Sequence, residues 1–318
     1  MKRLFSLFAI LIFSVVYAQA QQTSGMAFLN IAPDPYQQSL SEATTSVYTG
    51  AASIYANPAL TTYAESSDLR ASYTFWIADT RNSYASALFK RPKSALGIAV
   101  TSSRVDDLEL RTVPGEAAGD FSVEYLSISG TYARDFKFFS LGITGMYLFE
   151  KILTDEASGY GFTFGASSRL FQDRVTLGVS LRNLGQMSEL NEVNTELPTD
   201  FRAGFNADIL QFSTDGNTET PILISVSGDV IKPLNEPEQS VLNGNGLNDL
   251  DALYGNAAVR VNVFKMIELR SGFRFRDDSR TFSSGVGLER NNISFDFAYV
   301  PFETGFGNVF SLGLGYRF

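Results

Sequence analysis

The sequence contains neither histidine nor cysteine. Their absence excludes imidazole acid–base catalysis, Ser-His and Cys-His nucleophiles, disulfide bonds and nearly every zinc site. Aspartate and glutamate total 34 against 25 for lysine and arginine, so the net charge is −9 and no basic surplus is available to bind nucleic acid. Walker A, dinucleotide-binding and serine-elbow motifs are also missing from the sequence. We therefore expect a protein that is not an enzyme and that uses no cofactor or metal.

The N-terminus has the pattern of an export signal. Lys2 and Arg3 precede an apolar run at 4–16, and Ala18 and Ala20 fit the small-x-small box of a cleavage site. This pattern predicts a signal peptide over 1–20, with an uncleaved signal anchor as the alternative. After residue 20 no apolar run reaches about 18 residues, which excludes a helical inner-membrane protein.

The rest of the chain alternates between apolar and polar residues. Leu69, Tyr73 and Phe75 share one face of a strand, whereas Arg70 and Thr74 share the other. We count about fourteen segments of this kind, an even number that places both ends of a bacterial outer-membrane barrel on the periplasmic side. The pattern predicts an all-β protein whose residues 67–318 form a transmembrane outer-membrane β-barrel of about 14 antiparallel strands.

The lengths of the connections support a barrel over a soluble β-sandwich. Tight connections at 91–94, 134–137 and 171–174 alternate with longer ones such as 104–120 and 150–158. Outer-membrane barrels place short turns in the periplasm and long loops outside the cell, whereas a sandwich has no such systematic alternation. We therefore expect outer-membrane lipid to surround the protein.

The C-terminal sequence FSLGLGYRF places Tyr316 and Phe318 on one face of the last strand, with an aromatic residue at the end. It resembles the terminal signal by which outer-membrane barrels are recognised during assembly. A soluble edge strand with this ending would be an aggregation hazard. We therefore expect the barrel-assembly machinery to be a partner.

Residues 21–66 have a different sequence pattern from the predicted barrel region. Alternation disappears there, and Pro33, Pro35 and Pro58 break the stretch into short helical or irregular pieces. Apolar residues such as Phe28 and Ile54 need cover that a free tail would not give them. We favour an N-terminal plug segment inside the barrel over a periplasmic tail.

Several motifs resemble the PorV/PorQ family, which is itself similar to the FadL long-chain fatty-acid transporters. They are FLNIAPDP, SEATTSV, YANPAL, YARDFKFFSLGITGMYLFE, LGVSLRNLG and ELPTDFRAGF, and they extend over nearly the whole chain. The resemblance implies a fourteen-stranded barrel with a plug that carries the motif Asn57, Pro58 and Ala59. It further implies an accessory role in type IX protein secretion or cargo attachment, with secretion components and secreted cargo as partners. The alternative is a FadL-like channel for uptake of hydrophobic small molecules.

Charged residues on the inward faces form the remaining candidate site. The candidate cluster consists of Arg260, Arg270, Arg274, Arg276, Glu289 and Asp296. It is either a site for an anionic head group or peptide carboxylate, because arginine presents a fixed fork of donors, or a structural network in a polar lumen. We favour the structural network. Inward glycines, among them Gly142 and Gly178, either clear space for a ligand or plug or let the sheet bend, and we favour bending.

Overall fold

The computed structural model describes residues 23–24, 26–110, 119–189, 195–213, 221–235, 253–277, 280–302, 305 and 307–318. The predicted signal peptide, 1–20, lies outside the described residues. None of the helices in the described ranges is long and apolar enough to cross a membrane.

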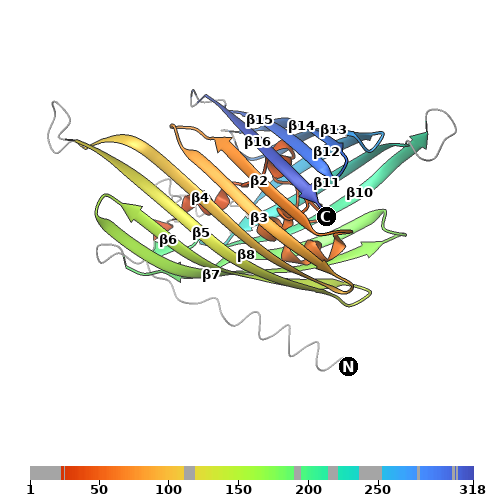
Figure 1. Ribbon diagram of the computed structural model, residues 1–318, viewed down its shortest axis with the longest axis horizontal. Coiled ribbons are helices and arrows are strands. Elements are labelled where there is room, and N and C mark those ends of the chain that lie inside the picture. The colour runs from red at the N-terminus through yellow and green to blue at the C-terminus, as the bar shows by residue number, and fades with distance from the viewer. Residues whose placement is uncertain are drawn as a thin grey trace, which may run out of the picture.

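One continuous sheet of 16 strands forms the molecule, and two of its strands, β1 (Thr23–Ser24) and β9 (Thr195–Glu196), have only two residues each. The remaining 14 form the wall of a closed barrel. These wall strands are β2 (Asp68–Phe75), β3 (Arg81–Arg91), β4 (Ser94–Leu110), β5 (Gly119–Asp135), β6 (Ser140–Ile152), β7 (Asp155–Leu170), β8 (Val175–Met187), β10 (Asp200–Ser213), β11 (Pro221–Pro233), β12 (Tyr254–Val263), β13 (Ile267–Phe275), β14 (Phe282–Arg290), β15 (Ile293–Pro301) and β16 (Asn308–Arg317). The predicted fold class is confirmed (Figure 1).

Closure comes from antiparallel pairing of the last strand with the first. β16 pairs with β2 from Phe310–Phe75 to Arg317–Asp68. Beyond the last ladder pair, the backbone N–H of Phe318 donates to the carbonyl of Ser67 at 2.9 Å. Tyr316 and Phe318 stack with their ring centroids 6.1 Å apart on the outer face. Their recognition by an assembly machinery stays a prediction.

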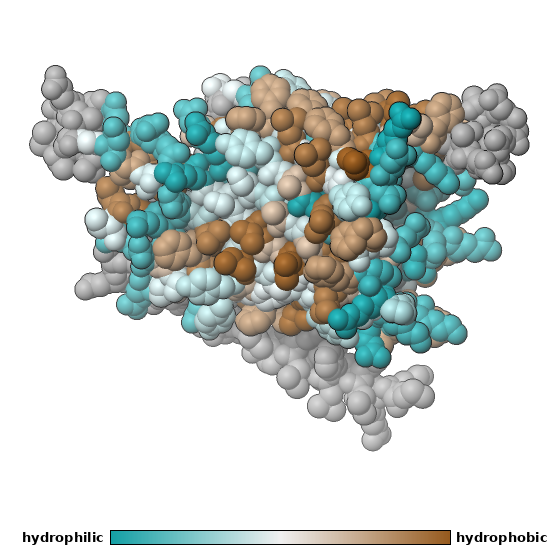
Figure 2. All heavy atoms as spheres, viewed as in Figure 1, coloured by the Kyte–Doolittle hydropathy of each residue, from teal (hydrophilic) through white to brown (hydrophobic). Residues whose placement is uncertain are grey.

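The two faces of the wall meet different environments, as the alternation predicts. On β5 the outward Ile128 is 49% exposed, while the inward Thr131 is 4% exposed and hydrogen-bonds to Thr144. Figure 2 shows apolar side chains over the middle of the strands and hydrophilic ones toward both ends of the barrel. This apolar band is the lipid-facing surface of an outer-membrane barrel.

The two ends of the barrel differ. Short turns at 92–93, 136–139, 171–174, 264–266 and 291–292 lie at the end that also holds the C-terminus, which we call the short-turn end. The opposite end is the long-loop end. The expectation of a long connection at 150–158 is wrong, because β6 and β7 continue pairing up to Ile152 and Asp155. β6 and β7 extend to a tight turn there, because the backbone N–H and C=O groups of the two strands hydrogen-bond to each other along the ladder.

Residues 26–66, here called the N-terminal segment, lie inside the barrel (Figure 1). Their elements are the 3-10 helices η1 (Ala27–Asn30) and η2 (Pro58–Tyr63) and the short α-helices α2 (Pro35–Ser39) and α3 (Ser53–Ala56). Pro35 and Pro58 each occupy a first helical position, which suits a residue that has no backbone N–H to donate. Their neighbours Asp34 and Asn57 cap the same helices. The prolines therefore start short helices as well as breaking long ones.

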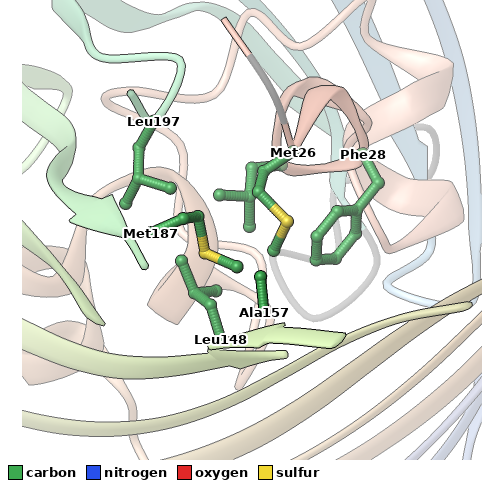
Figure 3. Packing of buried hydrophobic residues seen from close by; sticks show 7 residues of the cluster. Met26, Phe28, Leu148, Ala157, Met187 and Leu197 are labelled. Carbon is green, nitrogen blue, oxygen red and sulfur yellow. The ribbon is translucent and has the colours of Figure 1, made fainter. Parts of the chain in front are cut away.

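An apolar cluster anchors the beginning of this segment to the wall at the long-loop end. Met26 and Phe28 point toward Leu148, Met187 and Leu197 (Figure 3). Phe28 also stacks on Tyr125 of β5, with ring centroids 5.3 Å apart. The segment thus runs from the long-loop end down to the short-turn end, where β2 begins.

The lipid-facing assignment predicts a cost that depends on depth. Ile128→Arg, near the middle of β5, should destabilise the barrel by about 2–4 kcal/mol, whereas Leu170→Arg, at the short-turn end of β7, should cost about 0–1 kcal/mol. Urea unfolding in phospholipid vesicles measures both values, with Ile128→Val as the control for lost packing. Equal costs at the two depths would show that Ile128 does not face hydrocarbon.

Candidate functional site

The Asn57-Pro58-Ala59 motif lies against the lumenal wall. The side-chain amide of Asn57 donates to the carbonyl oxygens of Thr45 at 2.8 Å and Ala166 at 3.2 Å, and its Oδ1 accepts from the backbone N–H of Ala59 at 3.1 Å. Asn57 is fully buried. One side chain therefore ties two parts of the N-terminal segment to β7.

Glycines in the wall create the space for this motif. A Cβ at Gly142 would come within 2.5 Å of backbone atoms of Pro58 and Ala59, and one at Gly165 would lie 2.0 Å from Oδ1 of Asn57. A Cβ at Gly178 would meet the carbonyl of Thr45 at 2.3 Å. The expectation that these glycines serve mainly to bend the sheet is therefore wrong for Gly142 and Gly178. These positions require glycine because the backbone of the segment lies directly on the strands.

Three of the predicted charged residues lie within one lumenal network. Arg270 donates to Asp296 at 2.6 Å, and its guanidinium lies 4.1 Å from the ring centroid of Tyr36. Arg260 donates to the hydroxyl of Tyr36 at 3.1 Å and to Asn206 at 2.6 Å. These arginines bind groups of the protein itself, an arrangement that favours the structural network over a ligand site.

Arg274 belongs to a second network that the sequence did not predict. Oε1 of Glu42 lies 3.0 Å from Arg274 and 3.3 Å from Arg280, and Oε2 of Glu42 lies 3.5 Å from Arg202. Arg202 also forms an ion pair with Asp200, at 3.0 Å. The carboxylate of Glu42 thus links the N-terminal segment to β10, to β13 and to the loop that follows β13.

Two predicted members lie outside both networks. Arg276 is exposed, follows the last residue of β13 and donates to the carbonyl oxygen of Leu253 at 3.1 Å. Its φ of 64° turns it away from the register that Arg274 occupies. Glu289 points inward but lies at the short-turn rim, where it pairs with Arg317. Neither residue contributes to a lumenal ligand site.

The charge of Glu42 depends on these arginines. Glu42 lies in the N-terminal segment, outside the membrane-crossing strands. Burial acts to raise its pKa, but the positive charges of Arg274, Arg280 and Arg202 outweigh burial and lower the pKa from an ordinary value of 4.5 to about 2. Glu42 is therefore ionised throughout the physiological pH range.

A cavity of about 40 Å³ lies between the beginning of the N-terminal segment and strands β3 to β8. Phe28, Leu29 and Ile54 of the segment line it together with Ala99 and Met146 of the wall. Polar groups such as Thr144 and Asn183 complete the lining. Within the described ranges no cluster of acidic side chains is arranged to hold a metal ion. The cavity is therefore mixed in character, with apolar side chains mainly from the segment and hydroxyl and amide groups mainly from the wall.

Solved structures share this architecture. The Ralstonia pickettii toluene transporter TbuX superposes with a TM-score of 0.55 at 10% identity over 90% of this chain and 98% of that chain. The CymD monoaromatic hydrocarbon channel gives a TM-score of 0.60 at 12% identity over 93% and 99%. The P. putida toluene transporter TodX gives a TM-score of 0.57 at 9% identity over 94% and 99%.

These neighbours define the chain as an outer-membrane β-barrel of the FadL type in fold. They are transporters or channels, not enzymes. No protein-family model and no curated protein matches the chain, so the PorV/PorQ resemblance stays a prediction. The predicted role in type IX secretion has no support among these neighbours, whereas the alternative, a channel for hydrophobic molecules, agrees with what they are.

The close contact at Gly142 predicts that a larger residue there weakens the packing of η2 against the wall. Gly142→Ala should destabilise the packing of η2 by about 1–3 kcal/mol, because the added Cβ meets backbone atoms. Gly130→Ala on the neighbouring strand is the control, since nothing lies within 4 Å of a Cβ there. Limited proteolysis of the N-terminal segment measures the difference. Equal cleavage in both variants would mean that η2 does not rest on Gly142.

The Glu42 network predicts an acid-sensitive contribution to stability. Because the pKa in the folded protein, about 2, lies below the ordinary 4.5, the contribution is full above pH 4.5 and is lost as the pH falls toward 2. Glu42→Gln should cost about 3–5 kcal/mol at neutral pH by leaving buried arginines without their anion. It should also remove this part of the acid transition in urea unfolding between those pH values. An unchanged acid transition in the variant would contradict the assignment.

Proposed function

We propose that this protein is an outer-membrane channel for small hydrophobic molecules of about the size of a monoaromatic hydrocarbon. The observation behind this proposal is the lumenal cavity. The N-terminal segment supplies most of its apolar lining, Ala99 and Met146 of the wall add to it, and hydroxyl and amide groups of the wall complete it. The substrate class is supported by TbuX and TodX, which are toluene transporters, and by CymD, which is a monoaromatic hydrocarbon channel. The N-terminal segment acts as the plug of this channel.

The size of the cavity requires the plug to move during transport. Its volume of about 40 Å³ is close to the space of one water molecule, whereas a dry cavity of about 150 Å³ is known to bind benzene. A monoaromatic ligand therefore fits only after part of the lining has shifted. Residues 26–31 supply that part, since Phe28, Leu29 and Ile31 all line the cavity.

The bonding of the segment supports residues 26–31 as the moving part. Within the described residues their hydrogen bonds are internal to the segment, such as Tyr55 Oη to the carbonyl of Leu29 at 3.0 Å. The later part is bonded to the wall, for example from the backbone N–H of Thr45 to Asp229 at 2.9 Å. Shifting residues 26–31 breaks apolar contacts and the hydrogen bond from Tyr55 to Leu29 but leaves the buried ion pairs intact.

The outer wall offers such solutes an apolar surface next to the cavity. A hollow of about 630 Å³ lies on the membrane side of β2, β3, β4 and β16 and is lined by small residues including Ala71, Ala85 and Ala87. Ala99 lines both this hollow and the lumenal cavity, so a single layer of paired strands separates them. Hydrophobic solutes dissolved in the membrane can accumulate beside the cavity.

Uptake of labelled toluene by cells that produce or lack the protein tests the proposal. We expect uptake to rise with the wild type and to rise further with Phe28→Ala/Leu29→Ala, which enlarges the cavity. Ala99→Phe should fill the cavity and lower uptake, while Ala166→Phe on the lipid side of β7 should leave it unchanged. Uptake that does not exceed that of cells without the protein, at equal amounts of folded barrel, would refute a channel function.

A tether distinguishes local movement from release of the whole plug. The hydroxyls of Thr62 in the segment and Ser140 in β6 lie 2.8 Å apart, so Thr62→Cys/Ser140→Cys can form a disulfide in a chain without other cysteines. Thr74→Cys/Ser311→Cys, which joins β2 to β16 within the wall, is the matched control. We expect uptake to persist in both oxidised variants. A block in the first alone would show that the whole segment must leave.

A further inference from the structure

Two turns at the short-turn end carry the most exposed large hydrophobic side chains of the described residues. Phe138, in the turn after β5, is 77% exposed, and Phe171, in the turn after β7, is 76% exposed. The two turns adjoin each other, because Ser140 pairs with Ser167 in the β6–β7 ladder and the hydroxyl of Ser168 donates to the carbonyl of Phe138 at 2.7 Å. We call this surface the aromatic corner.

Phe136 and Phe139 extend the corner and stack on each other with ring centroids 5.3 Å apart. Leu141 and Leu170 then continue it into the lipid-facing band of the wall. The corner is therefore the edge of the membrane-facing surface at the short-turn end. Leaving aromatic rings of this size in water is unfavourable, and aromatic residues collect where hydrocarbon meets head groups.

Basic residues accompany these rings. The guanidinium of Arg134 lies 5.7 Å from the ring centroid of Phe136, and Nζ of Lys137 lies 5.7 Å from that of Phe138. Arg174 follows in the second turn. Long basic side chains beside interfacial rings place their charges at the depth of lipid phosphates.

The carboxylates of the corner already have partners. Asp173 lies 3.3 Å from Arg169, and Asp135 accepts from the backbone N–H of Lys137 at 2.9 Å. Among the described residues, no carboxylate forms an ion pair with Arg134, Lys137 or Arg174. Three cations are thus available at the surface of a protein whose net charge is −9.

The positive charge is a property of this end of the barrel. Each described short turn contains or adjoins a basic residue, and these are Lys93, Lys137, Arg174, Lys265 and Arg290. At the long-loop end Arg104 lies 2.9 Å from Glu124 and Lys151 lies 2.8 Å from Glu156, so these two bases are already paired. An anionic partner is therefore favoured more at the short-turn end than beside Arg104 and Lys151.

We propose that the aromatic corner is a binding site for the head groups of anionic phospholipids in the leaflet at the short-turn end. The exposed phenylalanine rings enter the interface between head groups and hydrocarbon. Arg134, Lys137 and Arg174 bind the phosphates beside them. The partner is lipid because the corner is continuous with the lipid-facing band.

Lipid selectivity tests this site in the full-length barrel reconstituted in phosphatidylcholine vesicles. Electron paramagnetic resonance gives the association of spin-labelled phosphatidylglycerol relative to spin-labelled phosphatidylcholine. We expect a preference for phosphatidylglycerol that falls by up to about fivefold for each base removed in R134Q/K137Q/R174Q at low salt. R81Q/R104Q/K151Q, which removes three bases at the long-loop end, is the matched control and should keep the preference. No preference in the wild type, or an equal fall in both triple variants, would overturn the proposal.

A second measurement does not depend on the charge variants. The chain has a single tryptophan, Trp76, so W76F/F138W carries one reporter at the corner. We expect blue-shifted emission that is quenched by lipids brominated near the head group. Emission typical of water, without quenching, would mean that Phe138 projects away from the membrane, as a docking site for a protein partner would require, and would overturn the lipid site.

Discussion

Closure of the backbone ladder is the constraint on which the rest of this structure depends. In hydrocarbon every backbone N–H and C=O needs a partner, and pairing β16 with β2 leaves no free edge in the wall. A closed wall has an inner face that never meets lipid, so the inward positions hold hydroxyls, glycines and charges. The lumen they enclose needs filling, and the N-terminal segment fills it. The shape of that segment follows from the wall, since glycines such as Gly142 stand where its backbone touches the strands.

Buried ion pairs connect the N-terminal segment to the wall and connect strands of the wall to each other in this lumen. Glu42 alone lies within ion-pair distance of arginines on three elements or loops of the barrel, and Asp296 joins Arg70 to Arg270. Such pairs stabilise little over a well-packed apolar contact, but breaking one leaves a buried charge that costs several kcal/mol. They therefore fix the position of the segment more than they add to the stability of the fold.

The strands were predictable because alternation is local and each wall residue has only two environments. The turn after Arg91 and the strand from Val175 follow directly from that pattern. Arg270, Arg274 and Asp296 were also found by their inward register. Their partners were not, because Glu42 and Tyr36 lie in an irregular segment where no period indicates which side chain faces the wall. Arg276 does not share the inward register of Arg274, because the strand ends before it at a positive φ that no glycine or proline in the sequence indicates.

The beginning of the N-terminal segment contacts the wall through apolar side chains, whereas the later part adds hydrogen bonds and ion pairs to its apolar contacts. A plug held only by apolar contacts would be free to leave, and one held only by ion pairs would stay closed. Here the cluster of Met26, Phe28 and Leu29 contacts the wall at the long-loop end, while Asn57 and Thr62 bond to it farther along. A hydrophobic solute can replace the apolar contacts of Phe28 and Leu29 with its own, so their displacement costs little when solute is present. It has no groups to replace those of Asn57, so in the proposed channel the later part of the segment stays in place while residues 26–31 move.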